Sequence, residues 1–339
     1  METVTNQIFQ LQYAIDTFYF LVMGALVMWM GAGFAMLESG LVRAKNTTEI
    51  LTKNVLVYAI ACTAYMVVGY DIMYGGGVFL SGIAGGDNLV ADALTASAEN
   101  GFDGGAVYST AADFFFQAVF VAATMSIVSG AVAERMKLWT FLAFAVVMTA
   151  FIYPMEGFWT WGGGSVFGMY SLGDIGYLDF AGSGIVHMAG ASAALAGVIL
   201  LGARKGKYGP NGEIRAIPGA NLPLATLGMF ILWMGWFGFN GGSVLKLGDM
   251  ANSNLVAMVF LNTNAAAAGG ALAALIVARL MFGKADLTMV LNGALAGLVA
   301  ITAGPDTPTP LMATMIGAVG GALVVISVIT MDKIKIDDP

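Results

Sequence analysis

The chain has 339 residues, of which 58% are hydrophobic and only 10% are charged. A soluble domain usually carries about 25% charged residues, so this composition excludes a water-soluble globule and predicts a surface that lies in lipid. The net charge of −7 and the scattered basic residues offer no binding surface for nucleic acid.

Apolar stretches long enough to cross a bilayer recur along the chain. A membrane-spanning helix needs about 20 apolar residues, and nine stretches meet this requirement. They are residues 18–37, 54–72, 114–133, 138–155, 184–203, 221–244, 254–278, 287–304 and 309–330. The segment before the first stretch is polar and lacks Lys and Arg, unlike a signal peptide. The sequence therefore predicts an all-α integral membrane protein and not an enzyme.

The Lys and Arg residues predict the orientation of these stretches, because cytoplasmic loops retain positive charge. They cluster in the loops after the first, third, fifth, seventh and ninth stretches. Of the 14 Lys and Arg residues, only Lys246 lies in a loop of the other set. The N-terminus is therefore expected outside and the C-terminal end inside. The predicted outer loop 74–112 is rich in glycine and contains the acidic residues Asp87, Asp92, Glu99 and Asp103.

Small residues and a faint repeat indicate how the helices pack. Gly293 to Gly297 and Gly317 to Gly321 are patterns that let helices approach closely in lipid. The segment Trp29 to Phe34 is echoed by Trp233 to Phe239, five stretches later. Copies separated by an odd number of spans run in opposite directions, as in inverted-repeat transporters; chance similarity also explains so short an echo. A repeat of five plus five would need a tenth helix, so the chain is expected to be incomplete at its C-terminus.

Few polar side chains occur inside the stretches. The single histidine, His187, lies in the fifth stretch, where an ionisable residue is costly and often functional; the alternative is a neutral imidazole bonded to a neighbouring helix. Asp179 precedes it by about 12 Å of helix and either caps that helix or acts on a cation. The lone Cys62 favours packing and excludes an intrachain disulfide. The spacing of these residues predicts no catalytic group, metal site or cofactor.

Aromatic residues form stripes at helical spacing. The stripes are Phe116 with Phe120 in the third stretch, and Trp236, Phe239 and Ser243 in the sixth. Trp161 follows the fourth stretch. Such stripes usually face lipid or the core, but a face of aromatic rings can also hold a cation.

Four motifs resemble the ammonium transporter family, which is related to the Rh proteins. They are Phe34 to Asn46, Gly130 to Arg135, Asp179 to His187 and Gly235 to Ser243. The resemblance runs from the first stretch to the last residue. It implies one membrane domain over 1–339 with an eleven-helix inverted-repeat fold. It also implies that a second pore histidine should follow a segment like 337–339, so that the chain is incomplete there.

The resemblance implies a role for each candidate residue. Trp161, Ser243 and Phe116 would recruit ammonium at the outer side, and Phe120 and Phe239 would form a stacked gate. His187 would be a pore histidine beside Trp236, and Asp179 and Thr302 would support the outer vestibule. The resemblance further implies a homotrimer in the plasma membrane and a cytoplasmic regulatory partner of the PII type.

A bare cation in hydrocarbon costs tens of kcal/mol, so proton removal and passage of neutral ammonia past His187 is one mechanism. The sequence leaves open whether ammonia, ammonia plus a proton, or the ion crosses. It also leaves open an ammonium sensor, a gas channel of the Rh type and a non-conducting remnant.

Overall fold

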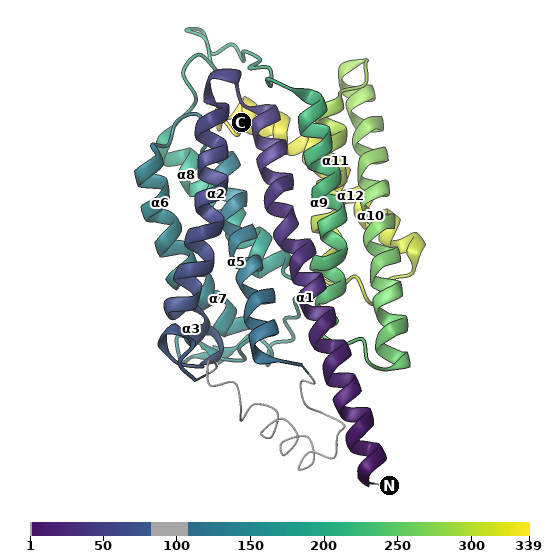
Figure 1. The fold of residues 1–339 in the computed structure, drawn as a ribbon. Coiled ribbons are helices and arrows are strands. Elements are labelled where there is room, and N and C mark those ends of the chain that lie inside the picture. Colours follow the sequence, from purple (N-terminus) through teal and green to yellow (C-terminus); the bar gives the residue numbers. More distant parts are fainter. Residues whose placement is uncertain (1, 83–107) are drawn as a thin grey trace.

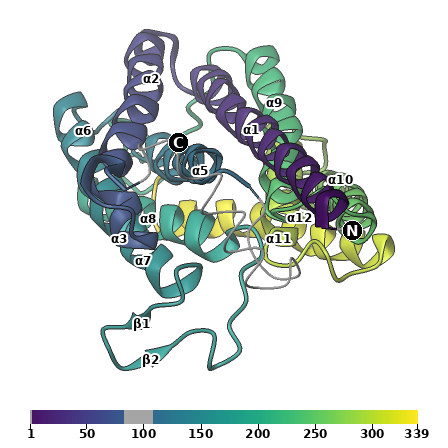
Figure 2. The same ribbon diagram turned by 60° about the horizontal axis from the view of Figure 1, so that its bottom comes forward.

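The computed structural model describes residues 2–82 and 108–339. These residues form a bundle of long helices with the N-terminus at one end and the C-terminus at the other (Figure 1). A hairpin of β1 (Ser165–Val166) and β2 (Tyr170–Ser171) projects from the bundle (Figure 2). The four acidic residues predicted in the outer loop lie outside the described residues.

Eight helical segments in the described part of the chain are long and apolar enough to cross a membrane. Eight of the nine predicted stretches thus correspond to helical segments of membrane-spanning length. The remaining stretch, 287–304, forms α11 (Leu287–Ile301), which has 15 residues and is only about 22 Å long. The uninterrupted spans are α1 (Glu2–Leu41), α5 (Thr110–Ala131), α9 (Leu222–Gly242), α10 (Met250–Phe282) and α12 (Pro310–Lys333).

The other three spans each contain a π-helical segment. The first joins α2 (Thr47–Ala64), η2 (Tyr65–Gly69) and α3 (Tyr70–Tyr74), and the second joins α6 (Leu138–Val147), η4 (Met148–Ile152) and α7 (Tyr153–Thr160). The third consists of η5 (Ser183–Met188) and α8 (Ala189–Leu201). Short 3-10 turns are η1 (Ala44–Asn46) and η3 (Val78–Leu80). π-Helical segments are frequent at functional sites. His187 lies in η5, so this helix is a candidate for the functional site.

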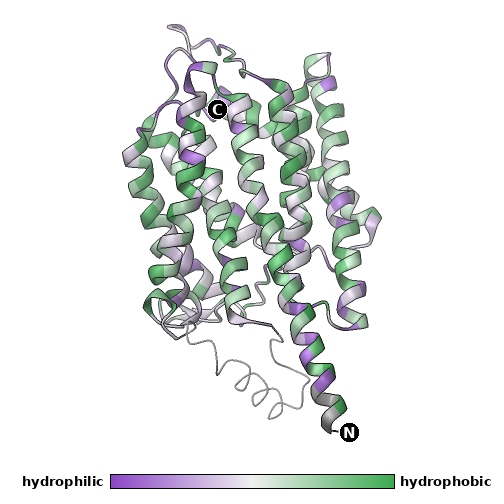
Figure 3. Ribbon diagram, in the orientation of Figure 1, coloured by the Kyte–Doolittle hydropathy of each residue, from purple (hydrophilic) through white to green (hydrophobic). Residues whose placement is uncertain are grey.

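Side-chain caps fix where the later helices begin. Asn221, Asp249, Asp286 and Thr309 each accept a hydrogen bond from a backbone N–H in the first turn of α9, α10, α11 and α12, respectively. These are the residue types that satisfy free amides at a helix start. Figure 3 shows that the helices they open are predominantly apolar along their length.

Glycines bring helices into backbone contact, as the small-residue patterns predicted. A Cβ on Gly317 would collide with the carbonyl of Ala266, and a Cβ on Gly321 with that of Gly270, so α12 lies directly on α10. The two echoed segments also face each other, since α1 and α9 run side by side (Figure 1). A Cβ on Gly235 would meet the side chain of Met30. The close packing that was predicted is confirmed.

An ion-pair cluster joins four segments at the end of the bundle that carries the basic loops. It consists of Arg43, Glu134, Arg135, Arg204 and Asp337. Arg43 donates from Nε to both carboxylate oxygens of Glu134 at 3.0 Å, and Arg204 donates to Asp337 at 2.9 Å from both Nε and an Nη. The side chains of Glu134 and Asp337 are fully buried. Opposite charges with several hydrogen bonds are the arrangement in which buried ions persist.

The cluster shifts the ionisation of its carboxylates. Burial disfavours the charged form of Glu134, but hydrogen bonds from Arg43 and Asn46 outweigh it and lower its pKa to about 2. Burial likewise opposes ionisation of Asp337, and hydrogen bonds from Arg204 again lower its pKa below the usual value. Both groups are therefore charged at neutral pH.

Candidate functional site

Five rings from three helices stack into what we call the aromatic column: Phe116, Phe120, Phe239, His187 and Trp236. The rings of Phe116 and Phe120 lie 4.7 Å apart between centroids, and Phe120 stacks on Phe239 at 4.1 Å with 26° between the planes. His187 lies 5.4 Å from Phe239 and stacks on Trp236 at 5.0 Å and 12°. The column thus joins the two aromatic stripes and the single histidine.

Each helix supplies its ring through ordinary helical spacing. Phe116 and Phe120 are four residues apart on α5, and Trp236 and Phe239 are three residues apart on α9, so each pair shares a face. All five rings of the column are buried. Phe20 on α1 packs edge-on against Phe116 at 5.0 Å and closes the column on that side.

The buried imidazole of His187 has an unused nitrogen. Its Nε2 is buried and has no hydrogen-bond partner among the described residues. The hypothesis that the imidazole is bonded to a neighbouring helix is therefore unsupported at Nε2. A buried polar atom without a partner is costly, and a small polar solute at this point of the column could supply the missing hydrogen bond.

Asp179 caps the helix that carries His187. Its carboxylate accepts hydrogen bonds from the backbone N–H groups of Gly182 at 3.0 Å, Gly184 at 2.9 Å and Ile185 at 3.0 Å. This confirms the capping interpretation of Asp179. Its backbone carbonyl also accepts a 2.8 Å hydrogen bond from the indole Nε1 of Trp161, so Asp179 positions that ring as well as the helix.

Trp161 meets the column from the side. Its ring lies 6.0 Å from that of Phe120 at an angle of 77°. Ser243 is half-buried, and its hydroxyl donates to the carbonyl of Phe239 at 2.8 Å. A Cβ on the adjacent Gly242 would collide with the ring of Phe116, which places the end of α9 beside that ring. Within the described part of the chain, no hydrogen bond or ring contact joins Trp161 to Ser243.

Thr302 is fully buried and contacts the deep part of the column. Its hydroxyl accepts a 2.8 Å hydrogen bond from the indole of Trp236 and donates at 2.7 Å to the carbonyl of Leu298. Its carbonyl accepts from the N–H of Ala181 at 3.2 Å. Thr302 therefore links Trp236 to the segment that follows Asp179.

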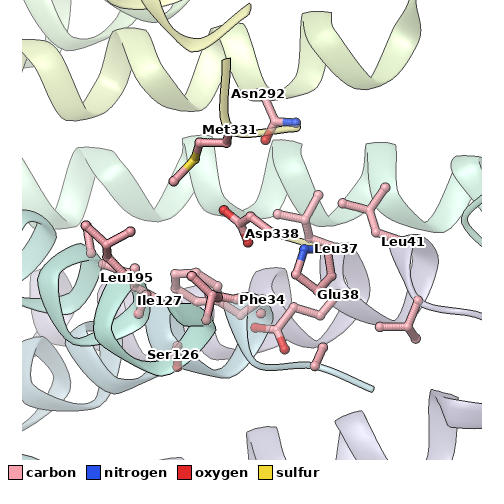
Figure 4. Close-up of a pocket in the computed structure, with 18 residues that line it drawn as sticks. Phe34, Leu37, Glu38, Leu41, Ser126, Ile127, Leu195, Asn292, Met331 and Asp338 are labelled. Carbon is pink, nitrogen blue, oxygen red and sulfur yellow. The ribbon is translucent and has the colours of Figure 1, made fainter. Parts of the chain in front are cut away.

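Glu38 (Figure 4) lies within the motif from Phe34 to Asn46, but its spacing predicted no role for it. Glu38 is buried in α1 and accepts hydrogen bonds from Ser129 at 2.6 Å and Asn54 at 3.0 Å. An acidic residue near the end of an apolar span is a signal for function in its own right and could have identified it.

Comparisons with known proteins agree with one another. A family model described as the Ammonium Transporter Family matches residues 18–339. The ammonium transporter Amt2 of Archaeoglobus fulgidus is 43% identical over 96% of this chain and 67% of its own length. The putative ammonium transporter sll1017 of Synechocystis is 39% identical over 99% of this chain and 74% of its own length.

Solved structures show the same likeness. A chain named Sensor Amt Protein superposes with a TM-score of 0.83 at 35% identity, covering 100% of this chain and 79% of that one. The crystal structure of Candida albicans Mep2 superposes with a TM-score of 0.80 at 26% identity, covering 96% of this chain and 69% of that one.

Proposed function

Since the chain belongs to the ammonium transporter family, we propose that it carries ammonium or ammonia across a membrane along the aromatic column. The family is one of transporters and not of enzymes. The observation that carries the proposal is the continuous stack from Phe116 to Trp236, in which the buried Nε2 of His187 has no hydrogen-bond partner among the described residues.

Recruitment of the cation belongs to the end of the column that holds Phe116. Trp161, Ser243 and Phe116 would offer ring faces and a hydroxyl oxygen to ammonium there. Aromatic faces attract a cation by up to about 2 kcal/mol when water is removed. The edge contact of Trp161 with Phe120 and the position of α9 beside Phe116 support this arrangement.

The stacked rings of Phe120 and Phe239 would act as the gate. At a centroid distance of 4.1 Å they fill the column, so one ring must turn aside before a solute passes. Beyond them lies His187, which would offer a hydrogen bond to ammonia after the ion has lost its proton. Trp236 would hold the imidazole flat by stacking, and Thr302 and Asp179 would support these groups through the contacts described above.

Uptake into proteoliposomes tests the function. The purified chain should accumulate radiolabelled methylammonium, and Trp161→Leu should raise the apparent KM by up to roughly 30-fold, the equivalent of about 2 kcal/mol. Trp161→Phe keeps an aromatic face and is the matched control, with a smaller expected change. An unchanged KM in a well-expressed Trp161→Leu variant would contradict the recruiting site, whereas absent uptake by the wild type would contradict transport itself.

The orientation and partners are part of the proposal. The basic loops support an orientation with the N-terminus outside, and the family resemblance supports a homotrimer in the plasma membrane with a PII-type partner. An impermeant thiol reagent should label Asp174→Cys and not Lys205→Cys in intact cells, in a Cys62→Ala background. Equal labelling of both positions would refute the orientation. Native mass measurement of a stable monomer would refute the trimer.

A further inference from the structure

A short segment before η5 ties the hairpin of β1 and β2 to the helix that carries His187. Tyr177 follows the hairpin (Figure 2), and its backbone N–H donates to the carbonyl of Leu172 at 3.0 Å. Asp179 comes two residues later and caps η5 by accepting hydrogen bonds from three backbone N–H groups. A movement of this segment would therefore reach both the hairpin and the helix.

The side chain of Tyr177 lies against the cap that Asp179 forms. A Cβ on Gly184 would collide with the hydroxyl oxygen of Tyr177 and would lie 3.0 Å from Oδ2 of Asp179. Both oxygens therefore meet at the same glycine of η5, and the hydroxyl hydrogen-bonds the carboxylate. Gly184 leaves room for this contact because it has no side chain.

The phenol of Tyr177 is held in its protonated form. Partial burial raises its pKa, and the charge of Asp179, the hydrogen bond to that carboxylate and the charge of Glu156 raise it further. Loss of the proton would place another negative charge beside these carboxylates, which they disfavour. Tyr177 therefore keeps its O–H at neutral pH and remains a donor to Asp179.

Asp179 in turn acts on the proposed transport path at two places. Its carboxylate caps the helix on which His187 lies, and its backbone carbonyl accepts the indole N–H of Trp161 at 2.8 Å. The ring of Trp161 meets that of Phe120 at 6.0 Å. A shift of Asp179 would thus move the ring proposed to recruit ammonium and also the helix of the imidazole proposed to receive ammonia.

We infer that Tyr177 is a positioning residue for transport, which fixes Asp179 and through it both the recruiting ring and the helix that carries His187. The inference rests on the proposed function and extends it to a residue outside the aromatic column. Among the described residues, no ring of the column stacks on Tyr177, so its hydroxyl acts on the solute only through Asp179.

Uptake of methylammonium into proteoliposomes tests this role. Tyr177→Phe keeps the ring and removes the hydroxyl. It should raise the apparent KM by roughly threefold to tenfold, since a hydrogen bond to a charged group is lost but acts on the solute indirectly. Tyr170→Phe, the same change at an exposed position of β2, is the matched control and should leave KM unchanged. A merely structural role for Tyr177 would lower the amount of folded protein and the maximal rate without moving KM.

Gly184→Ala tests the same hydroxyl without changing Tyr177. The new Cβ would displace the hydroxyl, whereas it would lie in ordinary contact with the ring carbon Cζ at 3.4 Å. Gly184→Ala should therefore raise KM by itself and add little to Tyr177→Phe, which lacks the colliding atom. The small shift that the 3.0 Å approach to Asp179 requires is common to both backgrounds.

Three outcomes would contradict these expectations in different ways. An unchanged KM in a well-expressed Tyr177→Phe variant, measured beside a wild type that takes up methylammonium, would refute the inference and leave the transport proposal intact. Effects of Tyr177→Phe and Gly184→Ala that multiply in the double variant would also refute it, because the two residues would then act separately. Absent uptake by the wild type would refute the proposed function and this inference with it.

Discussion

The aromatic column and the ion-pair cluster are both buried in the same bundle, yet they are held by opposite means. In the column, neutral rings lie 4.1 to 5.4 Å apart and Nε2 of His187 has no partner among the described residues. In the cluster, Glu134 and Asp337 each accept hydrogen bonds from a guanidinium group at 2.9 to 3.0 Å. The Asn46 amide and the backbone N–H of Arg204 add neutral donors at 2.7 Å.

This difference fits what each region has to do. A path for a small polar solute must not hold it strongly, so dispersion between rings and one free nitrogen serve better than fixed charges. The cluster, by contrast, joins the α1–α2 turn, the α5–α6 loop, the α8–α9 loop and the segment after α12. Since those loops anchor the helices that bear the rings, we expect stability to reside at the cluster and solute affinity along the column.

The largest effect should come from breaking the cluster. Glu134→Ala removes the carboxylate that Arg43 and Arg204 share and leaves two partly buried guanidinium groups without it. Removing one partner of a buried pair costs about 3–5 kcal/mol, which should appear as a much lower midpoint of thermal unfolding in detergent. Lys137→Ala, at an exposed position of the same loop, is the control. Equal stability of the two variants would break the comparison.

Acid should act on the same contacts more gradually. The pKa of Glu134 is lowered to about 2, while that of an unfolded glutamate is about 4.3. A lowered pKa in the folded state means that stability is fully present above about pH 4.3 and is lost as the pH falls toward 2. The midpoint of unfolding should therefore decline over this window in the wild type, and more shallowly in Glu134→Gln. Parallel curves for both proteins would show that Glu134 does not carry the effect.

The sequence could predict the spans because their signal is local. A run of about 20 apolar residues identifies a membrane span without information from any other segment. The π-helical segment around Met148 did not interrupt that run. α11 is shorter than predicted because Thr302 ends the helix and Gly304 and Pro305 follow it. The shared helix face of Phe116 and Phe120 was likewise predictable, since the two residues lie four apart on one helix.

Contacts between distant segments could not be predicted in the same way. Trp236 and Thr302 are 66 residues apart, and Arg135 and Asp337 are 202 apart, so no periodicity relates them. The resemblance implied a supporting role for Thr302 but could not show that its hydroxyl accepts a hydrogen bond from Trp236. Glu38 was overlooked for a related reason: the hydrogen bonds that Ser129 and Asn54 donate to it form only when α1, α5 and α2 meet.

The smallest effect should come from the hydrogen bond between Trp236 and Thr302. Both partners are uncharged, so this bond sharpens the comparison between the aromatic column and the ion-pair cluster. Thr302→Val keeps the volume but leaves the indole N–H without its acceptor, and Trp236→Phe removes the donor. Each variant should lose about 1 kcal/mol of stability from the hydrogen bond, with further loss from the smaller ring in Trp236→Phe.

A double-mutant cycle isolates this bond, since the pair is in direct contact and should show coupling of about 1 kcal/mol. Because Trp236 stacks on His187 at 5.0 Å, loss of the bond should also let the imidazole shift, and methylammonium uptake should fall by a few-fold while expression stays normal.

The ion-pair variant Glu134→Ala should do the reverse, with a large loss of stability and little change in the KM of the folded fraction. If instead Thr302→Val proved as destabilising as Glu134→Ala, the column would depend on rigid polar anchoring as much as the cluster does. The division between a neutral path and a charged scaffold would then have to be abandoned.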